Sequence, residues 1–411
     1  MMLRLNPSEH GWMTALSTNA VMDALDADGG GARFVGGAVR NALLGEKVGD
    51  IDIATPLTPD EVIRRLTRAG LGAVPTGIAH GTITAISSGK PFEITTLRRD
   101  VSTDGRRATI AFTDRWDEDA SRRDFTMNAI YAARDGTLFD PTGGQVDIAE
   151  RRVRFVGDAA TRIREDYLRA LRLFRFHAWY GRGPIDATAL AAARTEKAGL
   201  KTLSGERVQK ELFRLLQAPD PIPTLQTMES AGILAEILPQ PLSIARLSAI
   251  RTLLAARGRH PIPAVSLMAM LPNEEAARRA STDLRLSNAD RDRLMHIAKR
   301  DDGIEASLSQ QAARHLIYRL GAARFEDELL LEASETPHDS RWDVLLSEAE
   351  NWKAPKFPLD GRDAMDAGAS EGPAIGRSLK AVEEWWAAEN FAPTRPALLR
   401  KLKEFLAAGG A

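Results

Sequence analysis

Hydrophobic and polar positions follow two different periods in the first 140 residues of the chain. Helical spacing runs through residues 12–29 and through residues 58–70, where Thr58 is the predicted cap and Glu61 stands three residues later. Short apolar or alternating runs predict strands, namely ARFVGG, DIDIAT, GTITAIS, PFEITTL and a strand pair in IYAARDGTLFDPTGG. The charged stretch 98–118 predicts a mobile loop instead.

Beyond about residue 155 the strand patterns fade and helical spacing continues to the end of the chain. Proline and glycine breaks interrupt it near residues 219–223, 257–263 and 353–358. The sequence therefore predicts an α+β fold, with a small mixed sheet and its helices in the first part and helices alone in the second.

Composition narrows the class of protein without naming its function. The chain has 411 residues, 27% charged and 44% hydrophobic, with a net charge of −1, so bulk charge does not indicate a nucleic-acid binder. It has no cysteine, which excludes disulfides, thiolate zinc sites and cysteine nucleophiles and fits a reducing compartment. The first residues hold no apolar segment of signal-peptide length, and no run of about 18 apolar residues follows. We therefore expect a cytoplasmic protein without a membrane partner.

Two aspartates on one predicted strand carry the first chemical signal. Side chains two residues apart on a strand point to the same face, so Asp50 and Asp52 are expected to converge. Two converging carboxylates repel each other unless a cation lies between them, and Mg²⁺ prefers oxygen ligands. Two such ions about 4 Å apart can activate an attacking hydroxyl and neutralise a leaving phosphate. A solvated strand end with two incidental acids is the alternative.

The glycine pair before these aspartates favours the metal interpretation. Gly36 and Gly37 end a strand and open a predicted helix, AVRNALLG, whose free N–H groups can receive a phosphate. Arg40 lies in the first turn of that helix, where a cation opposes the helix dipole, which indicates an anion nearby. The pattern is neither a P-loop nor a dinucleotide fingerprint.

These residues resemble the class II nucleotidyltransferases of the polymerase-β superfamily, which comprise bacterial tRNA CCA-adding enzymes and poly(A) polymerases. The family pattern GG-x-V-R-D-x-L-L-G-x(4)-D-x-D-x-x-T is matched at Gly36, Gly37, Val39, Arg40, Leu43, Leu44, Gly45, Asp50, Asp52 and Thr55. The chain departs from it at Asn41, where the family usually has aspartate. The resemblance implies that Asp50 and Asp52 are the catalytic and Mg²⁺-binding residues, and that Gly36, Gly37 and Arg40 hold the triphosphate. Glu93 is a weaker candidate for a third metal carboxylate.

A second stretch, RRDFTMNA at residues 122–129, is similar to the family motif RRDFTxNA. The resemblance implies contacts with the ribose and phosphates of the incoming nucleotide. The candidate nucleotide-binding residues of this motif are Arg122, Arg123, Asp124 and Asn128. The sequence does not decide which of the two arginines faces the nucleotide.

A third stretch, EDYLRALR followed by Arg175-Phe176, looks like the family's E-D-x-x-R-x-L-R-x-x-R-F helix. Asp166 and Arg169 are three residues apart and are expected to share a helix face. An acceptor beside a donor complements the base edges of cytosine and adenine, whereas uracil and guanine present the reverse order. An ordinary salt bridge is the alternative. The candidate residues for nucleotide selection and orientation are Glu165, Asp166, Arg169, Arg172 and Arg175.

Further matches extend the resemblance toward the C-terminus. Glu206, Arg207 and Val208 resemble a helix that braces the nucleotide-selecting helix, and residues 357–386 loosely resemble a tail segment that contacts tRNA. The resemblance thus implies a polymerase-β-like head at 1–140, an all-α, nucleotide-selecting neck at 141–220, and a helical, tRNA-binding body and tail at 221–411.

The resemblance leaves two branches of one family. Poly(A) polymerases usually carry a basic, aromatic stretch of the type G-R-R-F-R, and residues 73–86 have none. We therefore predict template-independent addition of C, C and A to the 3′ end of tRNA from CTP and ATP, with release of pyrophosphate. A poly(A) polymerase is the first alternative, and an inactive nucleotide- or RNA-binding protein is the second.

Overall fold

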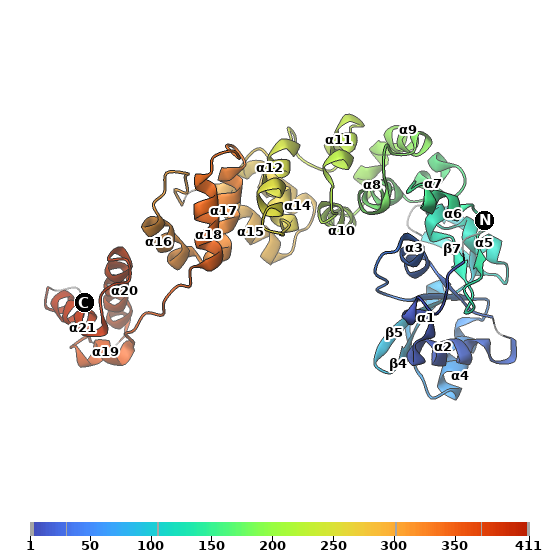
Figure 1. Cartoon of the computed structure of the whole chain (residues 1–411), viewed down its shortest axis with the longest axis horizontal. Helices are drawn as coiled ribbons and strands as arrows, with labels where there is room; N and C mark the ends of the chain where they lie inside the picture. Colours follow the sequence, from blue (N-terminus) through green and yellow to red (C-terminus); the bar gives the residue numbers. More distant parts are fainter. Residues whose placement is uncertain (1–3, 30, 105–106, 301, 371, 409–411) are drawn as a thin grey trace. The chain divides into compact units, whose positions relative to one another are not determined.

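The computed structural model describes residues 4–29, 31–104, 107–300, 302–370 and 372–408. The chain divides into two compact units, Met1–Leu238 and Pro239–Ala411, called here the N-terminal unit and the C-terminal unit. Figure 1 shows their elements in chain order. Among the described residues, no helix has both the length and the apolar character that a membrane span requires.

A mixed sheet of seven strands forms the core of the N-terminal unit. Its strand order is β3-β4-β5-β2-β1-β8-β9, and only the β2–β5 pair is parallel. The strands are β1 (Arg33–Val35), β2 (Asp52–Thr55), β3 (Gly72–Gly77), β4 (Thr82–Ser87), β5 (Lys90–Thr96), β8 (Tyr131–Ala132) and β9 (Leu138–Phe139). A separate hairpin joins β6 (Arg98–Asp104) and β7 (Arg107–Phe112).

Helices pack around this sheet and then continue alone. Helices α2 and α4 contact each other and strand β4, and α3 packs against β1. The helices of this unit are α1 (Gly11–Thr14), α2 (Leu16–Asp26), α3 (Gly37–Leu44), α4 (Pro59–Arg68), α5 (Trp116–Ser121), α6 (Gly144–Ala149), α7 (Ala159–Glu165), α8 (Leu168–Tyr180), α9 (Ala187–Glu196), α10 (Gly205–Leu216) and α11 (Ile222–Ser230). Short 3₁₀ turns are η1 (Ala27–Gly29), η2 (Ile78–His80), η3 (Thr126–Asn128), η4 (Lys197–Thr202) and η5 (Leu234–Glu236).

The C-terminal unit is helical throughout the part that the structure describes. Its helices are α12 (Ile244–Ala255), α13 (Pro263–Met270), α14 (Glu274–Asp283), α15 (Asn288–Lys299), α16 (Gln310–Leu320), α17 (Ala322–Ala333), α18 (Arg341–Asn351), α19 (Gly361–Asp366), α20 (Pro373–Ala388) and α21 (Arg395–Ala407). A small aromatic core around Trp386 and Phe391 joins α19, α20 and α21. The α+β class, with a small mixed sheet followed by helices, is confirmed. The finer division into head, neck and body stays a prediction.

Three local predictions were wrong. The stretch 98–118 holds the β6–β7 hairpin and the start of α5 rather than a loop, although Gly105 and Arg106 lie outside the described residues. The helix predicted for 12–29 is broken at Ala15, which has extended dihedral angles. Helix α4 begins after Thr58 as predicted, but the Thr58 side chain makes no capping bond, and the Glu61 side chain pairs with Arg64 and Arg65.

Candidate active site

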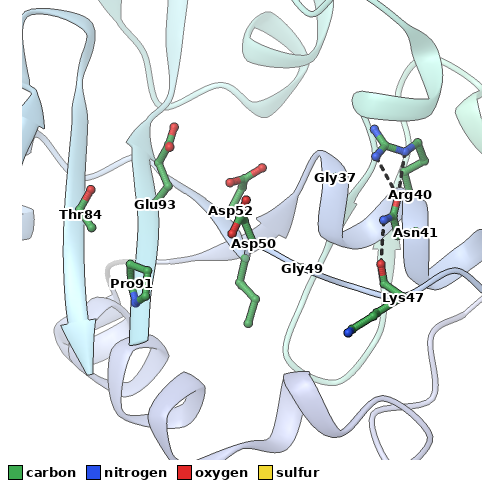
Figure 2. A pocket seen from close by; sticks show the side chains of 11 residues that line it. Gly37, Arg40, Asn41, Lys47, Gly49, Asp50, Asp52, Thr84, Pro91 and Glu93 are labelled. Atoms are coloured by element: carbon green, nitrogen blue, oxygen red, sulfur yellow. Dashed lines mark hydrogen bonds between the residues drawn. The ribbon is translucent and has the colours of Figure 1, made fainter. Parts of the chain in front are cut away.

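A polar cavity of about 550 Å³ lies at the N-terminal ends of the parallel, neighbouring strands β2 and β5. Figure 2 shows the side chains around it, with acids on one side and a group of polar and basic residues on the other. The lining residues are Gly37, Arg40, Asn41, Lys47, Gly49, Asp50, Ile51, Asp52, Thr84, Pro91 and Glu93. Five residues that the sequence marked as candidates therefore lie in one cavity: Gly37, Arg40, Asp50, Asp52 and Glu93.

The two aspartates reach this cavity in a way that the sequence did not predict. Strand β2 begins at Asp52, so Asp50 precedes the strand instead of lying on it. The segment just before the strand is still tied to β5, because the carbonyl of Ile51 accepts a hydrogen bond from the Glu93 amide at 3.2 Å. Both carboxylates point into the cavity, with Glu93 opposite Asp52 in the parallel register (Figure 2).

The electrostatics of the three acids fit a bound cation. Within the described residues, neither Asp50 nor Asp52 forms an ion pair or accepts a hydrogen bond at its side chain. Burial raises the pKa of Asp52 to about 6, and the negative charge of Glu93 adds to the rise. Carboxylates that lie close together repel one another, which costs free energy. A hard divalent cation, which prefers oxygen ligands, offsets this repulsion. The residues present therefore fit a divalent metal.

The Gly36-Gly37 turn brings a helix N-terminus next to these acids. Gly36 has a φ of 68°, a conformation that a side chain would strain. A Cβ atom at this position would also lie 3.2 Å from Oδ2 of Asp52. Glycine thus lets the backbone approach the carboxylate while α3 starts at Gly37, and the first N–H groups of α3 have no partner within the helix.

Arg40 connects the cavity to two other parts of the unit. Its guanidinium donates to Oδ1 of Asn128 at 2.7 Å and to the hydroxyl of Tyr180 at 2.9 Å, and it stacks on the Tyr180 ring at 4.1 Å. The side chain is buried, and burial lowers the pKa of Arg40. A contact between Arg40 and a phosphate stays a prediction. In the structure Arg40 holds α3 against α8 and η3.

Asn41, which replaces the family's usual aspartate, has a defined set of hydrogen bonds. Its Oδ1 accepts from Nη2 of Arg40 at 2.8 Å, and its Nδ2 donates to the carbonyl of Lys47 at 2.9 Å (Figure 2). A carboxylate accepts but cannot donate. Asparagine at this position thus ties α3 to the loop that leads to Asp50, which aspartate would not do.

The two arginines of the RRDFTMNA motif point in different directions. Arg122 donates to the carbonyl of Arg98 at 3.1 Å, away from the cavity. Arg123 lies with Nη1 3.9 Å from the Cβ position of Gly36, and its charge lowers the pKa of the nearby Asp52. Both pair with Asp119, at 2.6 Å and 3.0 Å. Arg123 is therefore the member of the pair that faces the two aspartates.

Asp124 and Asn128 belong to a hydrogen-bonded network rather than to the cavity wall. Asp124 accepts from Nε of Arg172 at 2.8 Å, from Nδ2 of Asn128 at 3.0 Å and from the Phe125 amide at 2.8 Å. Burial alone would raise the pKa of Asp124, but Arg172 and these hydrogen bonds hold it well below its usual range. Asn128 in turn accepts a hydrogen bond from Arg40 through Oδ1, which links Arg40 to the network.

The predicted base-reading pair does not share a helix face, so this expectation was wrong. Helix α7 ends at Glu165 and α8 begins at Leu168, with Asp166 extended between them. The cause is local: Oδ1 of Asp166 accepts from the Leu168 amide at 3.2 Å, a bond that competes with helix continuation.

Both side chains of the predicted pair have other partners. Asp166 pairs with Arg207 of α10 at 2.7 Å. Arg169 pairs with Glu165, its neighbour at i−4, and donates to the carbonyl of Arg162 at 3.1 Å. The two residues thus lie at one helix junction but are held by different groups.

Arg175 lines a second, smaller cavity. This cavity of about 280 Å³ is lined by Arg175, Trp179, Tyr180, Arg214 and Gln217. Arg175 pairs with Glu211, a buried acid on α10. Helix α10 therefore braces α8 through Glu211, while Arg207 pairs with Asp166 at the junction of α7 and α8.

Two residues of the site were missed by sequence reasoning. Lys47 lines the cavity from the loop after α3, and Tyr180 orients Arg40 from the end of α8. No motif marks either one. Lys47 could have been found from its position, because it is the one basic residue between the glycine that ends the predicted helix and the two aspartates.

Comparisons with known proteins agree with this geometry. A family model described as "Poly A polymerase head domain" matches residues 32–154, and one described as "Probable RNA and SrmB- binding site of polymerase A" matches residues 184–243. The "CCA tRNA nucleotidyltransferase 1, mitochondrial" of Mus musculus is 34% identical over 380 residues, which cover 90% of this chain and 86% of the relative.

Two bacterial proteins extend these similarities. The "CCA-adding enzyme" of Geobacillus thermodenitrificans is 38% identical over 216 residues, which cover 52% of either protein. The crystal structure of the Bacillus stearothermophilus CCA-adding enzyme in complex with CTP matches with a TM-score of 0.71 at 25% identity, and covers 96% of this chain and 98% of that one.

Proposed function

The chain belongs to the CCA tRNA nucleotidyltransferase family, and from this premise we propose how its own residues carry out CCA addition. It is a nucleotidyltransferase that adds C, C and A to the 3′ end of tRNA from CTP and ATP and releases pyrophosphate. The cavity that joins Asp50 and Asp52 to the N-terminus of α3 is the observation that carries this function. The comparisons favour neither a poly(A) polymerase nor an inactive binding protein.

Asp50 and Asp52 hold the metal. Enzymes of this family use a divalent metal, and we propose Mg²⁺ because the donors are carboxylate oxygens without a nitrogen or sulfur ligand. When bound, Mg²⁺ supplies positive charge that activates the tRNA 3′ hydroxyl and offsets the charge of the departing pyrophosphate. Glu93 faces the same space from β5 and is proposed as a third carboxylate near the ion.

The N-terminus of α3 receives the triphosphate. The N–H groups of Gly37 and the next residues are free of helix partners, and Gly36 leaves room for close approach. Arg123 is proposed to face the phosphates, supported by its position beside Gly36. Arg40 has most of its N–H groups engaged, so we assign it to holding α3, Asn128 and Tyr180 in place, with at most one direct phosphate contact.

The junction of α7 and α8 selects the base. An acceptor on Asp166 beside a donor on Arg169 matches the N3 and N4 edge of cytosine and the N1 and N6 edge of adenine. The carboxylate of Asp166 has acceptor positions beyond those that Arg207 and Leu168 use. Arg169 must exchange its bond to Glu165 for the base, so Glu165 sets its position.

The helical remainder of the chain is proposed to bind tRNA. The match of residues 184–243 to a probable RNA-binding segment supports this role for the end of the N-terminal unit. For the C-terminal unit, the loosely matching stretch 357–386 forms α19 and most of α20. The boundaries of head, neck and body at 140 and 220 remain part of this proposal.

We also propose a cytoplasmic location. The chain has no cysteine, which suits a reducing compartment. The mouse relative is mitochondrial by name, so a mitochondrial or other organellar pool is the competing location. Fractionation of the source cells with an antibody against the chain decides between the two.

The function is tested with labelled nucleotides, supplied singly and mixed, on tRNA lacking its 3′ CCA and on an unstructured RNA. Two C and one A on tRNA, followed by arrest, is the expected result. Long A tracts on either RNA would show that the chain is a poly(A) polymerase instead. No incorporation with Mg²⁺ present, while nucleotide still binds, would support the inactive binding protein.

A further inference from the structure

Three potential metal ligands meet in the C-terminal unit, outside the elements that form the active site. His296 lies on α15, Asp302 follows that helix, and Glu328 lies on α17. One ligand atom from each residue lies within 4.8 Å of the other two. Helices α15 and α17 pack against each other, so the three groups are held by a formed core rather than by a surface loop alone.

Glu328 is the residue that most needs a partner. Its residue surface is only 1% exposed, and Oε2 is buried without a hydrogen-bond partner among the described residues. The other oxygen, Oε1, accepts a long bond of 3.4 Å from the Asp302 amide. Leaving a buried acceptor unsatisfied is costly, so an unpaired carboxylate oxygen in a native core calls for a ligand.

His296 also has a buried ring nitrogen without a hydrogen-bond partner among the described residues. Nε2 of His296 is buried without a hydrogen-bond partner in the described structure and lies 3.9 Å from Oδ2 of Asp302. This separation is too long for a hydrogen bond. It suits two ligands of one ion, which lie farther apart than donor and acceptor because each contacts the ion at about 2 Å.

The neighbouring arginines are already paired with other acids. Arg319 donates to Oδ1 of Asp302 at 2.6 Å, and Arg300 pairs with Glu332 at 3.2 Å. Arg293 pairs with Asp327. Within the described residues none of these arginines forms an ion pair with Glu328. Burial and the charge of Asp302 raise the pKa of Glu328 to about 7, the direction expected for an acid that lacks a cation.

We propose that His296, Asp302 and Glu328 bind a divalent transition-metal ion, with Zn²⁺ as the best fit. One imidazole and two carboxylates suit Zn²⁺ better than Mg²⁺, which prefers oxygen ligands alone. The ion links α15, the segment after it and α17, and Arg319 orients Asp302 from behind. Its role is to stabilise the C-terminal unit, and it is independent of the Asp50–Asp52 site.

Zinc binding is measured on the full chain by equilibrium dialysis and elemental analysis. The parent protein carries Asp50→Asn and Asp52→Asn, so that the active-site carboxylates do not contribute. We expect close to one equivalent of Zn²⁺, lost in Glu328→Gln and in His296→Gln. Glu332→Gln, one turn further along α17 and paired with Arg300, is the matched control and keeps the ion.

Thermal unfolding with and without Zn²⁺ separates a lost site from a lost fold. We expect Zn²⁺ to raise the Tm of the parent and of Glu332→Gln and to leave the Tm of Glu328→Gln unchanged, because only a protein that binds the ion is stabilised by it. Without metal, Glu328→Gln should unfold at the parent temperature or above. Equal zinc content in Glu328→Gln and the parent, or no zinc in the parent, would overturn the proposal.

Discussion

Two groups of acids in the N-terminal unit have opposite surroundings. Asp52 is partly buried beside Asp50 and Glu93, with no ion pair in the described structure, and its pKa is raised to about 6. Asp119 is buried between Arg122, Arg123 and the hydroxyl of Tyr131, which donates to it at 2.6 Å. Burial would raise the pKa of Asp119, but these partners lower it to about 2.

The presence or absence of ion-pair partners distinguishes acids that stabilise the fold from acids that are available to bind a ligand. Asp119 and Asp124 form a network with Arg122, Arg123 and Arg172 of the same chain, so these carboxylates need no bound ion. The cavity acids repel each other, and their arrangement costs free energy that only a ligand recovers. Functional sites commonly retain such strain at the expense of stability.

Asp52→Asn should remove most of the catalytic activity. Loss of a charged metal ligand removes several kcal/mol of transition-state stabilisation, so we expect C and A addition to fall on the order of a thousandfold. Because Asp52 lacks an ion-pair partner, the variant should unfold at or above the wild-type Tm. Transfer kinetics together with thermal unfolding check both parts. Full activity, or a clear loss of stability, would contradict the assignment of Asp52 to metal binding rather than to the stability of the fold.

Asp124→Asn, in contrast to Asp52→Asn, should strongly reduce the stability of the fold. It leaves Arg172 without its main carboxylate partner in a largely buried site. Breaking such a pair from one side costs about 3 kcal/mol. Urea unfolding measures the change, with the exposed Asp114→Asn as control. An unfolding free energy equal to that of the control would show that the network is not structural.

The low pKa of Asp119 predicts a pH dependence of stability. Its carboxylate has a lower pKa in the folded chain than in the unfolded chain, so its contribution is complete above about pH 4 and is lost as the pH falls toward 2. A shift of this size corresponds to about 2 kcal/mol. Urea unfolding of Asp119→Asn between pH 5 and pH 3 should show a shallower decline than the wild type. Parallel curves would contradict the assignment.

Glu93→Gln should reduce the transfer rate only modestly. Glu93 is exposed and raises the pKa of Asp52 by its charge, so its removal should cost roughly tenfold in transfer rate if it lies near the ion without completing the site. The Mg²⁺ concentration for half-maximal rate should rise at the same time. A rate and Mg²⁺ dependence identical to the wild type would remove Glu93 from the metal site.

The main features of the fold and the cavity followed from the sequence because they depend on local patterns. Alternating runs marked β4 and β5, and the glycine pair marked the start of α3. The convergence of Asp50 and Asp52 was also expected, although for a reason that was only half right. Strand β2 is shorter than its sequence pattern, and a single hydrogen bond from the Glu93 amide to the Ile51 carbonyl ties the preceding segment to β5.

Predictions failed where a side chain competes with the backbone for hydrogen bonds, or where one local signal opposes another. Asp166 ends α7 by accepting from a backbone amide, and Arg207 reaches it from α10. No spacing rule reveals that competition. The charged residues of 98–112 predict a loop, whereas the Asp104-Gly105 pair is a common hairpin signal, and the segment forms a hairpin. Metal sites such as His296, Asp302 and Glu328 likewise need the packing of two helices to become visible.

The most direct test is a crystal structure of the full chain with Mn²⁺ and a non-hydrolysable CTP analogue. Anomalous scattering locates the ion without assumptions about the surrounding groups. Our account predicts a peak held by Asp50 and Asp52, with the triphosphate at the N-terminus of α3 and Arg123 beside it. A triphosphate bound elsewhere, or a cavity whose two aspartates hold no ion while nucleotide is bound, would contradict it.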